Sequence, residues 1–193
     1  MDTVDALAAA FALKDERRTG WQLRGVDDPE SVAGHAWGVA LLCLQYADEA
    51  GVDEACALRL AVVHDLAEAE TGDVATRADA DDQRVDGEEK VRRERAAMDD
   101  LAAPLSDDVR ALWEEYEARE TPAARFVKDM DLIDMCLQAL VYERADRYAA
   151  DDGERFNEYD DLDEFFATAE PRLRTDVGER LYATIRARYE DAK

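Results

Sequence analysis

Apolar residues recur along this chain with the spacing of an α-helix, and the apolar–polar alternation typical of strands is nearly absent. Within residues 3–16, for example, Val4, Leu7, Ala8 and Phe11 stand at positions i, i+3, i+4 and i+7. The pattern predicts an all-α protein. Further helices are expected at residues 29–51, 53–71, 88–103, 106–119, 121–149 and 162–191.

Capping residues and helix breakers set these expected boundaries. Pro29 is expected to open one helix. Asp53 is expected to cap the next helix, which Gly72 ends. Thr121 followed by Pro122 is a strong start signal, because a capping side chain precedes a proline at the first helical position. The polar, acidic stretches 74–87 and 151–161 are expected to be loops.

No repeat, low-complexity tract or linker divides the 193 residues, which is about the length of one domain. We therefore expect a single domain over residues 1–193, built as a helical bundle of about six to seven helices. The C-terminal helix at about 162–191 is expected to pack on the rest.

The charge is strongly unbalanced, with 48 acidic residues against 24 basic ones and a formal net charge of −24. This balance argues against nucleic-acid polymers and anionic membranes as partners. No apolar run approaches the roughly 20 residues that span a bilayer. The N-terminus lacks the positive segment of a secretory signal, so we expect a cytoplasmic protein.

The acidic residues are spread over the whole chain, and lysine occurs only four times. Such charge destabilises a compact state by self-repulsion in dilute buffer. About 1 M salt screens the repulsion, since the Debye length falls to about 3 Å. The composition therefore indicates a halophilic protein of haloarchaeal type.

Cysteine and glycine patterns exclude several kinds of site. Cys43, Cys56 and Cys136 are widely spaced in apolar surroundings, and no CxxC pair exists. We expect free thiols rather than disulfides or a cysteine-based zinc site. The usual glycine-rich phosphate loops, GxGxxG and GxxxxGK, are also missing.

The chain has only two histidines, His35 and His64. His64 and Asp65 are adjacent in the apolar segment LAVVHDLAEAETGD (60–73), where charged groups cost free energy unless they are paired or metal-bound. Glu68 is expected on the same helical face as His64, since it follows four residues later.

Antiparallel packing of the helices that bear His35 and His64 would bring the two imidazoles together. A further oxygen ligand should come from a third helix. Asp129, Asp131 and Asp134 all lie in the apolar segment FVKDMDLIDMCLQALVY, and periodicity does not choose among the three. Without such a site, each histidine would be an ordinary core or surface residue.

Taken together, these motifs resemble the HD-domain superfamily of metal-dependent phosphohydrolases, and in particular its 5′-deoxynucleotidase branch. The resemblance covers about residues 15–145, which would form the metal-binding core. It implies one divalent ion (Mn²⁺, Co²⁺, Ni²⁺, Fe²⁺, Mg²⁺ or Zn²⁺) bound by His35, His64, Asp65 and Asp131. The family pattern V-K-x-x-D selects Asp131 among the three aspartates of its segment. The chain departs from relatives at Ala33-Gly34, before the first histidine. The similar blocks are RTGW (18–21), RGV (24–26), PESVAGH (29–35), LAVVHDLAEAETGD (60–73), EEKVRRERAAM (88–98), LWEEYE (112–117) and ARFVKDMDLIDMCLQALVYE (124–143).

The resemblance also implies that Glu68 positions or deprotonates the attacking water, that Asp73 contacts the sugar, and that the protein is a homodimer. An acidic chain that binds a phosphate dianion must concentrate cations at the site. Those predicted to contact the phosphate are Arg18, Lys90 and Lys128.

Trp21 is expected either to wall the sugar or base pocket or to be a plain core residue.

The resulting hypothesis is a metal-dependent phosphomonoesterase that hydrolyses 5′-deoxynucleoside monophosphates, with a small nucleotide as substrate. The alternatives are another HD-type nucleotide phosphohydrolase, such as a pyrophosphohydrolase or a phosphodiesterase, and a non-catalytic, metal-stabilised regulatory protein.

Overall fold

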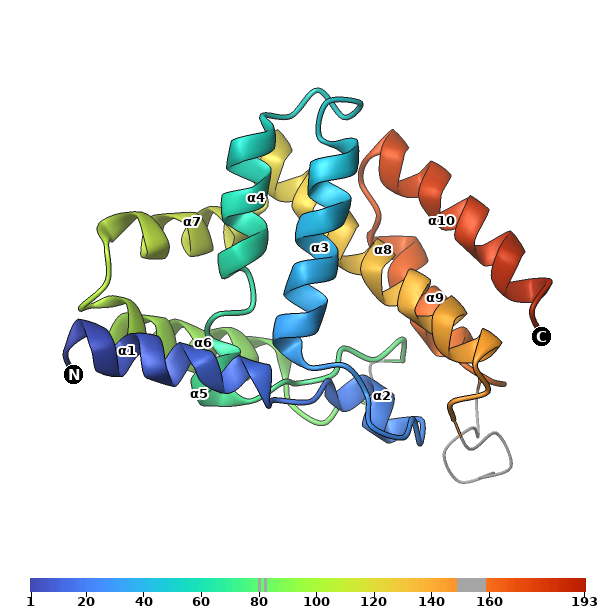
Figure 1. The fold of residues 1–193 in the computed structure, drawn as a ribbon, viewed down its shortest axis with the longest axis horizontal. Helices are drawn as coiled ribbons and strands as arrows, with labels where there is room; N and C mark the ends of the chain where they lie inside the picture. The colour runs from blue at the N-terminus through green and yellow to red at the C-terminus, as the bar shows by residue number, and fades with distance from the viewer. Residues whose placement is uncertain (80, 82, 149–158) are drawn as a thin grey trace.

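The computed structural model describes residues 1–79, 81, 83–148 and 159–193 (Figure 1). These residues are mostly helical and contain no strand, only an isolated antiparallel bridge between Arg17 and Ser31. The prediction of an all-α chain is confirmed for them. Across the described part of the chain, we find no helix with the length and apolar character needed to cross a bilayer.

Helix α8 (Pro122–Arg144) is the central element. It packs against α3 (Val32–Tyr46), α4 (Glu54–Val63), α7 (Asp107–Ala118) and α10 (Asp176–Glu190) (Figure 1). The remaining elements are α1 (Thr3–Ala10), α2 (Thr19–Leu23), α5 (Glu68–Thr71), α6 (Gly87–Ala102), α9 (Asp163–Ala169) and the 3₁₀ helices Phe11–Lys14 and Glu170–Arg172.

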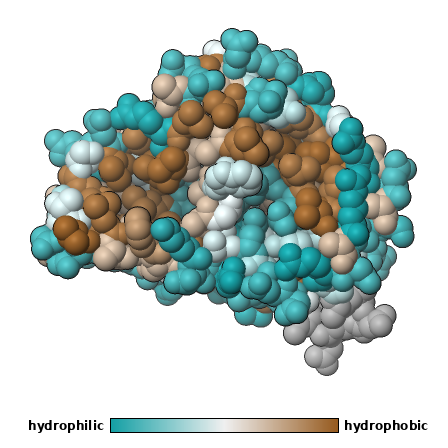
Figure 2. Space-filling model, in the orientation of Figure 1, coloured by the Kyte–Doolittle hydropathy of each residue, from teal (hydrophilic) through white to brown (hydrophobic). Residues whose placement is uncertain are grey.

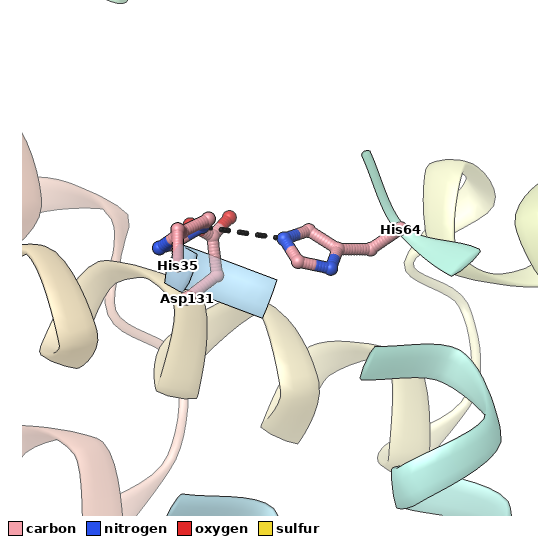
Figure 3. A group of neighbouring side chains, drawn as sticks. All are labelled: His35, His64 and Asp131. Atoms are coloured by element: carbon pink, nitrogen blue, oxygen red, sulfur yellow. Dashed lines mark hydrogen bonds and ion pairs between the residues drawn. The ribbon is translucent and has the colours of Figure 1, made fainter. Parts of the chain in front are cut away.

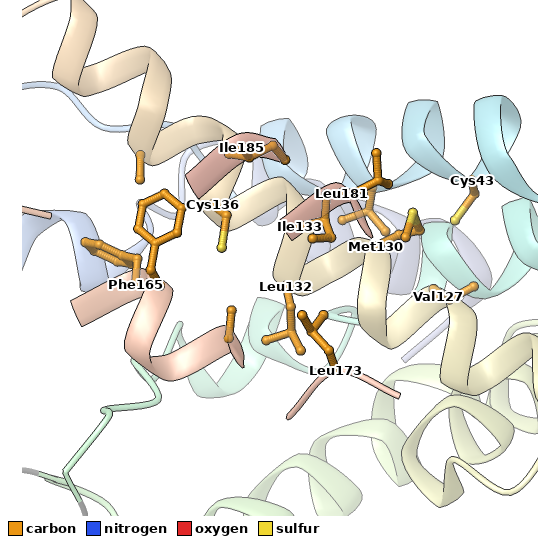
Figure 4. Close-up of a cluster of buried hydrophobic side chains, with 14 of the residues drawn as sticks. Cys43, Val127, Met130, Leu132, Ile133, Cys136, Phe165, Leu173, Leu181 and Ile185 are labelled. Atoms are coloured by element: carbon orange, nitrogen blue, oxygen red, sulfur yellow. The ribbon is translucent and has the colours of Figure 1, made fainter. Parts of the chain in front are cut away.

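The core surrounds α8, which buries apolar side chains on several sides (Figure 4). Burial of each large apolar side chain contributes about 1.5–3 kcal/mol. The three cysteines are free, as predicted. Burial raises the pKa of the Cys43 thiol to about 12, so this residue acts as an apolar core residue. Members of this core include Val127, Met130, Ile133, Cys136, Leu181 and Ile185.

Two expected boundaries of the helix at 29–51 are wrong. Pro29 does not open it: α3 begins at Val32, and the Ser31 side chain caps it by accepting from the Gly34 N–H. Residue 30 is held outside the helix because its N–H donates to the Tyr142 hydroxyl. The helix ends at Tyr46, so residues 47–51 form a turn.

Two expected helices are interrupted, which is why the prediction of about six to seven helices is too low. The helix at 53–71, capped by Asp53 as predicted, breaks after Val63 into α4 and α5. The helix at 162–191 breaks at residues 173–175, between a 3₁₀ turn and α10. The short α2 was not expected.

The break at 173–175 has a physical cause in α8. Asp129 is fully buried, and its carboxylate accepts from the Arg174 and Thr175 N–H groups and the Thr175 hydroxyl. These bonds satisfy backbone groups that a continuous helix would use internally. The helix expected to reach Ala149 ends at Arg144. Residues 149–158, which include most of the expected 151–161 loop, lie outside the described residues.

Candidate metal centre and substrate pocket

The chain unwinds where the two adjacent candidate ligands lie. After Val63 the helix gives way to i→i+3 turns: the Leu66 N–H donates to the Val63 carbonyl at 3.1 Å, and the Glu68 N–H donates to the Asp65 carbonyl at 3.0 Å. Glu68 therefore does not share a continuous helical face with His64, contrary to expectation. The unwinding turns His64 and Asp65 toward the same point.

Side chains from α3, α8 and this turn meet at that point (Figure 3). The Nε2 atoms of His35 and His64 are 3.3 Å apart. Asp131 Oδ1 lies 3.1 Å from His35 Nε2. Asp65 Oδ2 lies 3.2 Å from His64 Nε2 and 3.6 Å from His35 Nε2. The structure thus brings all four candidate ligands together.

The partners of the two histidines fix where their protons are. His64 Nδ1 lies 2.7 Å from the Ala61 carbonyl oxygen, and His35 Nδ1 lies 2.6 Å from Asp134 Oδ2, so each Nδ1–H donates outward. Burial and Arg18 oppose protonation of His35, but Asp134 and Asp131 outweigh them and raise its pKa to about 10. When both rings are neutral, as metal binding requires, both Nε2 lone pairs face each other and the carboxylates. Such an arrangement is repulsive unless a cation lies between the donors. Two imidazoles and two carboxylates, with Nδ1 held from behind, fit a divalent transition-metal ion.

The three aspartates of α8 have different positions, which the sequence pattern did not distinguish. Asp131 faces the histidine cluster, Asp134 contacts the outer nitrogen of His35, and Asp129 holds the backbone ahead of α10. Asp134 therefore orients the imidazole of His35. This contact lies beside the histidine whose preceding residues, Ala33 and Gly34, depart from the family pattern.

The second oxygen of Asp131 is held as well. Asp131 Oδ2 accepts from the Tyr116 hydroxyl at 2.8 Å and from Lys128 Nζ at 2.6 Å. Burial disfavours its charged form, but Lys128 and His35 outweigh this and hold the pKa of Asp131 well below its usual range. The carboxylate is therefore ionised and fixed in orientation.

Glu68 lies beside the cluster with one oxygen unused. Its side chain is buried, Oε2 has no hydrogen-bond partner, and Lys90 Nζ is 3.8 Å from Oε1. Burial, together with the nearby Asp65 and Asp73 carboxylates, raises the pKa of Glu68 well above its usual value. A buried carboxyl with a free oxygen has the properties of a general base or acid.

A pocket opens over this cluster. Among the residues that line it are all three cations predicted to contact phosphate, and each already contacts a carboxylate. Arg18 lies 3.4 Å from Asp65 and 3.5 Å from Asp73, while Lys90 lies 3.4 Å from Glu94. The pocket is lined by Arg18, Gly20, Trp21, Asp65, Glu68, Asp73, Val74, Ala75, Thr76, Lys90, Arg119, Lys128, Asp131, Leu132, Met135, Phe165, Thr168 and Arg172.

Asp73 and Trp21 lie on the same side of the pocket. Asp73 Oδ2 accepts from the Thr19 N–H at 2.6 Å, which ties the turn after α5 to α2. Trp21 belongs to the core, stacks on Phe165 with ring centroids 3.8 Å apart, and also lines the pocket. The two expectations for Trp21, pocket wall and core residue, are therefore compatible.

Sequence analysis did not single out several residues of the pocket and its supports. Tyr116 lies inside the LWEEYE block, but no spacing relates it to Asp131. Arg119, Thr168 and Arg172 come from helix ends far along the chain, and only the fold brings them to the pocket. No local signal could have identified them.

Comparison with protein families matches residues 10–173 to the HD domain. This chain belongs to the HD-domain family. The match contains the whole histidine–aspartate cluster and the pocket over it, so the HD domain supplies the candidate site.

Relatives of this HD domain carry nucleotidase names. A stretch of 139 residues is 42% identical to the 5′-deoxynucleotidase HDDC2 of Xenopus laevis and covers 70% of this chain and 66% of the relative. The chain thus matches just under two thirds of the length of that relative. The 5′-deoxynucleotidase hdd1 of Schizosaccharomyces pombe is 35% identical over 173 residues, covering 86% of this chain and 79% of the relative.

Solved structures share the fold over nearly the whole chain. The PH0347 protein from Pyrococcus horikoshii OT3 superposes with a TM-score of 0.74 at 29% identity, covering 98% of this chain and 99% of that one. A structure described as a predicted metal-dependent phosphohydrolase from Magnetospirillum magnetotacticum superposes with a TM-score of 0.67 at 25% identity, covering 98% and 90%.

Proposed function

We propose that this protein is a metal-dependent phosphomonoesterase that hydrolyses 5′-deoxynucleoside monophosphates to deoxynucleoside and phosphate. The observation that carries the proposal is the cluster of two imidazole Nε2 atoms and two carboxylates beneath a pocket lined with cations. The names of the relatives support the choice of substrate.

In this proposal His35, His64, Asp65 and Asp131 hold one divalent ion. When bound there, such an ion would lower the pKa of a water molecule and offset the charge of the phosphoryl group. Asp134 orients His35, since it accepts the Nδ1 proton at 2.6 Å.

Glu68 is the proposed general base. Glu68 lines the pocket, and its carboxylate, whose Oε2 has no hydrogen-bond partner, would accept a proton from the water that attacks phosphorus. The water oxygen bonds to phosphorus as the bond between phosphorus and the 5′ oxygen breaks, and the proton that Glu68 took from the water passes to the 5′ oxygen of the leaving deoxynucleoside. Arg18, Lys90 and Lys128 would offset the charge of the phosphate, and Asp73 would contact the sugar.

Two other functions compete with this one. A pyrophosphohydrolase would need room and cations for a second phosphate, and Arg119 and Arg172 are further cations in the pocket lining. A phosphodiesterase would act on a single phosphate with two ester bonds, and a regulatory protein would need no buried base. The unpaired Glu68 oxygen favours an enzyme, because an inert site gains nothing from a buried carboxyl without partners.

The test is phosphate release from a panel of 5′-deoxynucleoside monophosphates, ribonucleotides, diphosphates and cyclic nucleotides, with Mn²⁺, with Co²⁺ and with chelator. Metal-dependent release from the deoxynucleoside monophosphates above all others supports the proposal. Preference for a diphosphate or cyclic substrate would replace it with the corresponding alternative, and no turnover with any metal would leave the regulatory one.

We further propose that two copies form a dimer through the apolar side chains exposed on α3, α4 and α8, here called the apolar face. Figure 2 shows hydrophobic side chains gathered over these helices. Trp37 is 69% exposed. In a chain of net charge −24, a continuous uncharged patch is best explained by a partner with the same patch. The apolar face comprises Trp37, Leu41, Leu44, Val62, Leu137 and Val141.

Light scattering after gel filtration tests this assembly. We expect a dimer for the wild type and a monomer for Trp37→Glu, with Arg59→Glu on the polar side of α4 as the control. A monomeric wild type at micromolar concentration would contradict the dimer.

We also propose a cytoplasmic location. The absence of spanning helices among the described residues and the acidic composition support it.

A further inference from the structure

Two cations in the pocket lining, Arg119 and Arg172, are bound differently from the rest. The three cations predicted to contact phosphate each contact a carboxylate of this protein. In the described part of the chain, the other two guanidinium groups contact no carboxylate: Arg172 donates to a carbonyl oxygen of α9, and Arg119 lies over a tyrosine ring. In a chain of net charge −24, cations that line a pocket without a carboxylate partner can bind an anion from outside.

Arg119 occupies a backbone position that usually belongs to glycine. It ends α7 with a φ of 54°, in the left-handed region, where an L side chain costs free energy and glycine does not. Its Cζ lies 5.9 Å from the centroid of the Tyr116 ring, and the Tyr116 hydroxyl donates to Asp131 at 2.8 Å. The guanidinium therefore lies one side chain away from the metal cluster. An unfavourable backbone position beside a candidate site indicates that this side chain has a function there.

Arg172 lines the same pocket from the 3₁₀ turn after α9. Besides its bond to the Thr168 carbonyl oxygen, its guanidinium lies 3.5 Å from the Arg77 carbonyl oxygen, so the backbone of two segments holds it in place. These contacts involve Nη1 and Nη2 and leave further N–H donors of the planar group for a ligand. Burial and the charge of Arg119 both lower the pKa of Arg172. The two like charges repel each other unless an anion lies between them.

We infer that Arg119 and Arg172 form a second phosphate subsite, next to the one over the metal cluster. Guanidinium groups bind phosphate through paired N–H donors, and two of them around one phosphate offset its charge. The ligand would be a nucleoside diphosphate, bound through both phosphates and competing with the monophosphate. The nucleotide part of this inference rests on the proposed function, whereas the second phosphate subsite does not.

The test compares methylenediphosphonate, a diphosphate analogue that resists hydrolysis, with methylphosphonate, which has one such group. Calorimetric titration of the Mn²⁺-loaded protein, at a fixed excess of Mn²⁺, gives the ratio of the two Kd values. We expect the wild type to prefer the diphosphonate. Arg119→Gln and Arg172→Gln should each lower this preference about tenfold or more, the usual effect of losing a hydrogen bond to a charged group.

The control is Arg188→Gln, which makes the same change of charge on the exposed side of α10 and should keep the preference of the wild type. Free Mn²⁺ binds the ligands equally in every sample, so the differences among variants report the arginines alone.

Arg119→Gly separates a role in binding from a role in folding. It relieves the left-handed backbone and removes the guanidinium, so the preference should fall about tenfold while the melting temperature does not fall. This variant carries the test if Arg172→Gln does not fold. An unchanged preference in Arg119→Gly would overturn the subsite, as would a wild type that binds both ligands equally. Since the titrations need no turnover, the subsite can stand where hydrolysis is not observed and can fail where it is.

Discussion

At the scale of single residues, the strongest feature is the pair of imidazoles whose Nε2 atoms lie 3.3 Å apart. Their outer nitrogens donate to Ala61 and Asp134, which leaves both Nε2 atoms directed at each other and at the carboxylates. The carboxylates of Asp65 and Asp131 add negative charge at the same point. The arrangement is stable only with a positive charge at its centre.

We expect His64→Ala to abolish binding of Mn²⁺, because it removes one of four donors. Asp134→Asn should weaken binding about 10–100-fold, the usual effect of removing a group that orients a metal-binding histidine. Asp108→Asn, on an exposed part of α7, is the control. Calorimetry and metal analysis of the purified proteins provide the measurement, and the melting temperature of the wild type should rise with Mn²⁺ by linkage. Full metal binding by His64→Ala would contradict the proposed ligand set.

Glu68 should affect the reaction rather than metal binding. We expect Glu68→Ala to retain the ion, leave KM nearly unchanged and lower kcat by about 10²–10⁴, the usual contribution of a general acid or base. Steady-state kinetics combined with metal analysis makes the distinction. Loss of the metal together with activity would identify Glu68 as a ligand.

At the scale of the elements, a buried ion-pair network joins α2, the segment after α5 and α9. Glu164 Oε2 accepts from Arg24 Nε at 3.0 Å, and its Oε1 accepts from Arg77 Nε at 2.6 Å. Burial opposes ionisation of Glu164, but Arg77 and Arg24 outweigh it and lower its pKa. The network holds the wall of the pocket that contains Phe165 and Thr168.

We expect Glu164→Gln to destabilise the fold at pH 7 by up to about 3–5 kcal/mol, since it removes the negative charge that the buried Arg24 and the partly buried Arg77 contact. A lowered folded-state pKa means that the carboxylate stabilises above its unfolded pKa, about 4.3, and that this contribution is lost as the pH falls through the folded value. Denaturant unfolding at pH 7 and near pH 4 should show the difference shrinking at the lower pH.

The control is Glu49→Gln, which removes an exposed pair with Arg180 and should cost no more than about 1 kcal/mol. A difference between Glu164→Gln and wild type that grows as the pH falls would show that Glu164 is not stabilised as a carboxylate.

At the scale of the whole molecule, the chain carries 48 acidic residues against 24 basic ones. Self-repulsion erodes a stability that is typically only about 5–15 kcal/mol. We expect the melting temperature to climb steadily with KCl up to about 2 M, because the salt screens repulsion at a Debye length of about 3 Å or less. Activity should persist at this KCl concentration, since the phosphate of the substrate would contact the metal ion directly.

Thermal melts in salt-free buffer and in concentrated KCl check this expectation. Equal or higher stability without salt would contradict the halophilic interpretation. It would not affect the proposed reaction, because the two arguments use different residues.

The sequence by itself determined the helical class, because periodicity and capping act within a few residues of one another. It also yielded four candidate ligands, since His35, His64, Asp65 and Asp131 stand in recognisable blocks. The extent of a single domain over the whole chain stays a prediction.

Tertiary structure decided what depends on neighbours distant in the chain. Helix 53–71 unwinds at His64 so that two adjacent side chains reach one point, and the helix at 162–191 breaks where Asp129 captures backbone N–H groups. The same holds for the three aspartates of α8, which look alike by spacing and differ only in what packs opposite each one. Thr168 lies in the pocket for the same reason. The local pattern determines which residues share a helix face, but only packing determines which distant residues that face contacts.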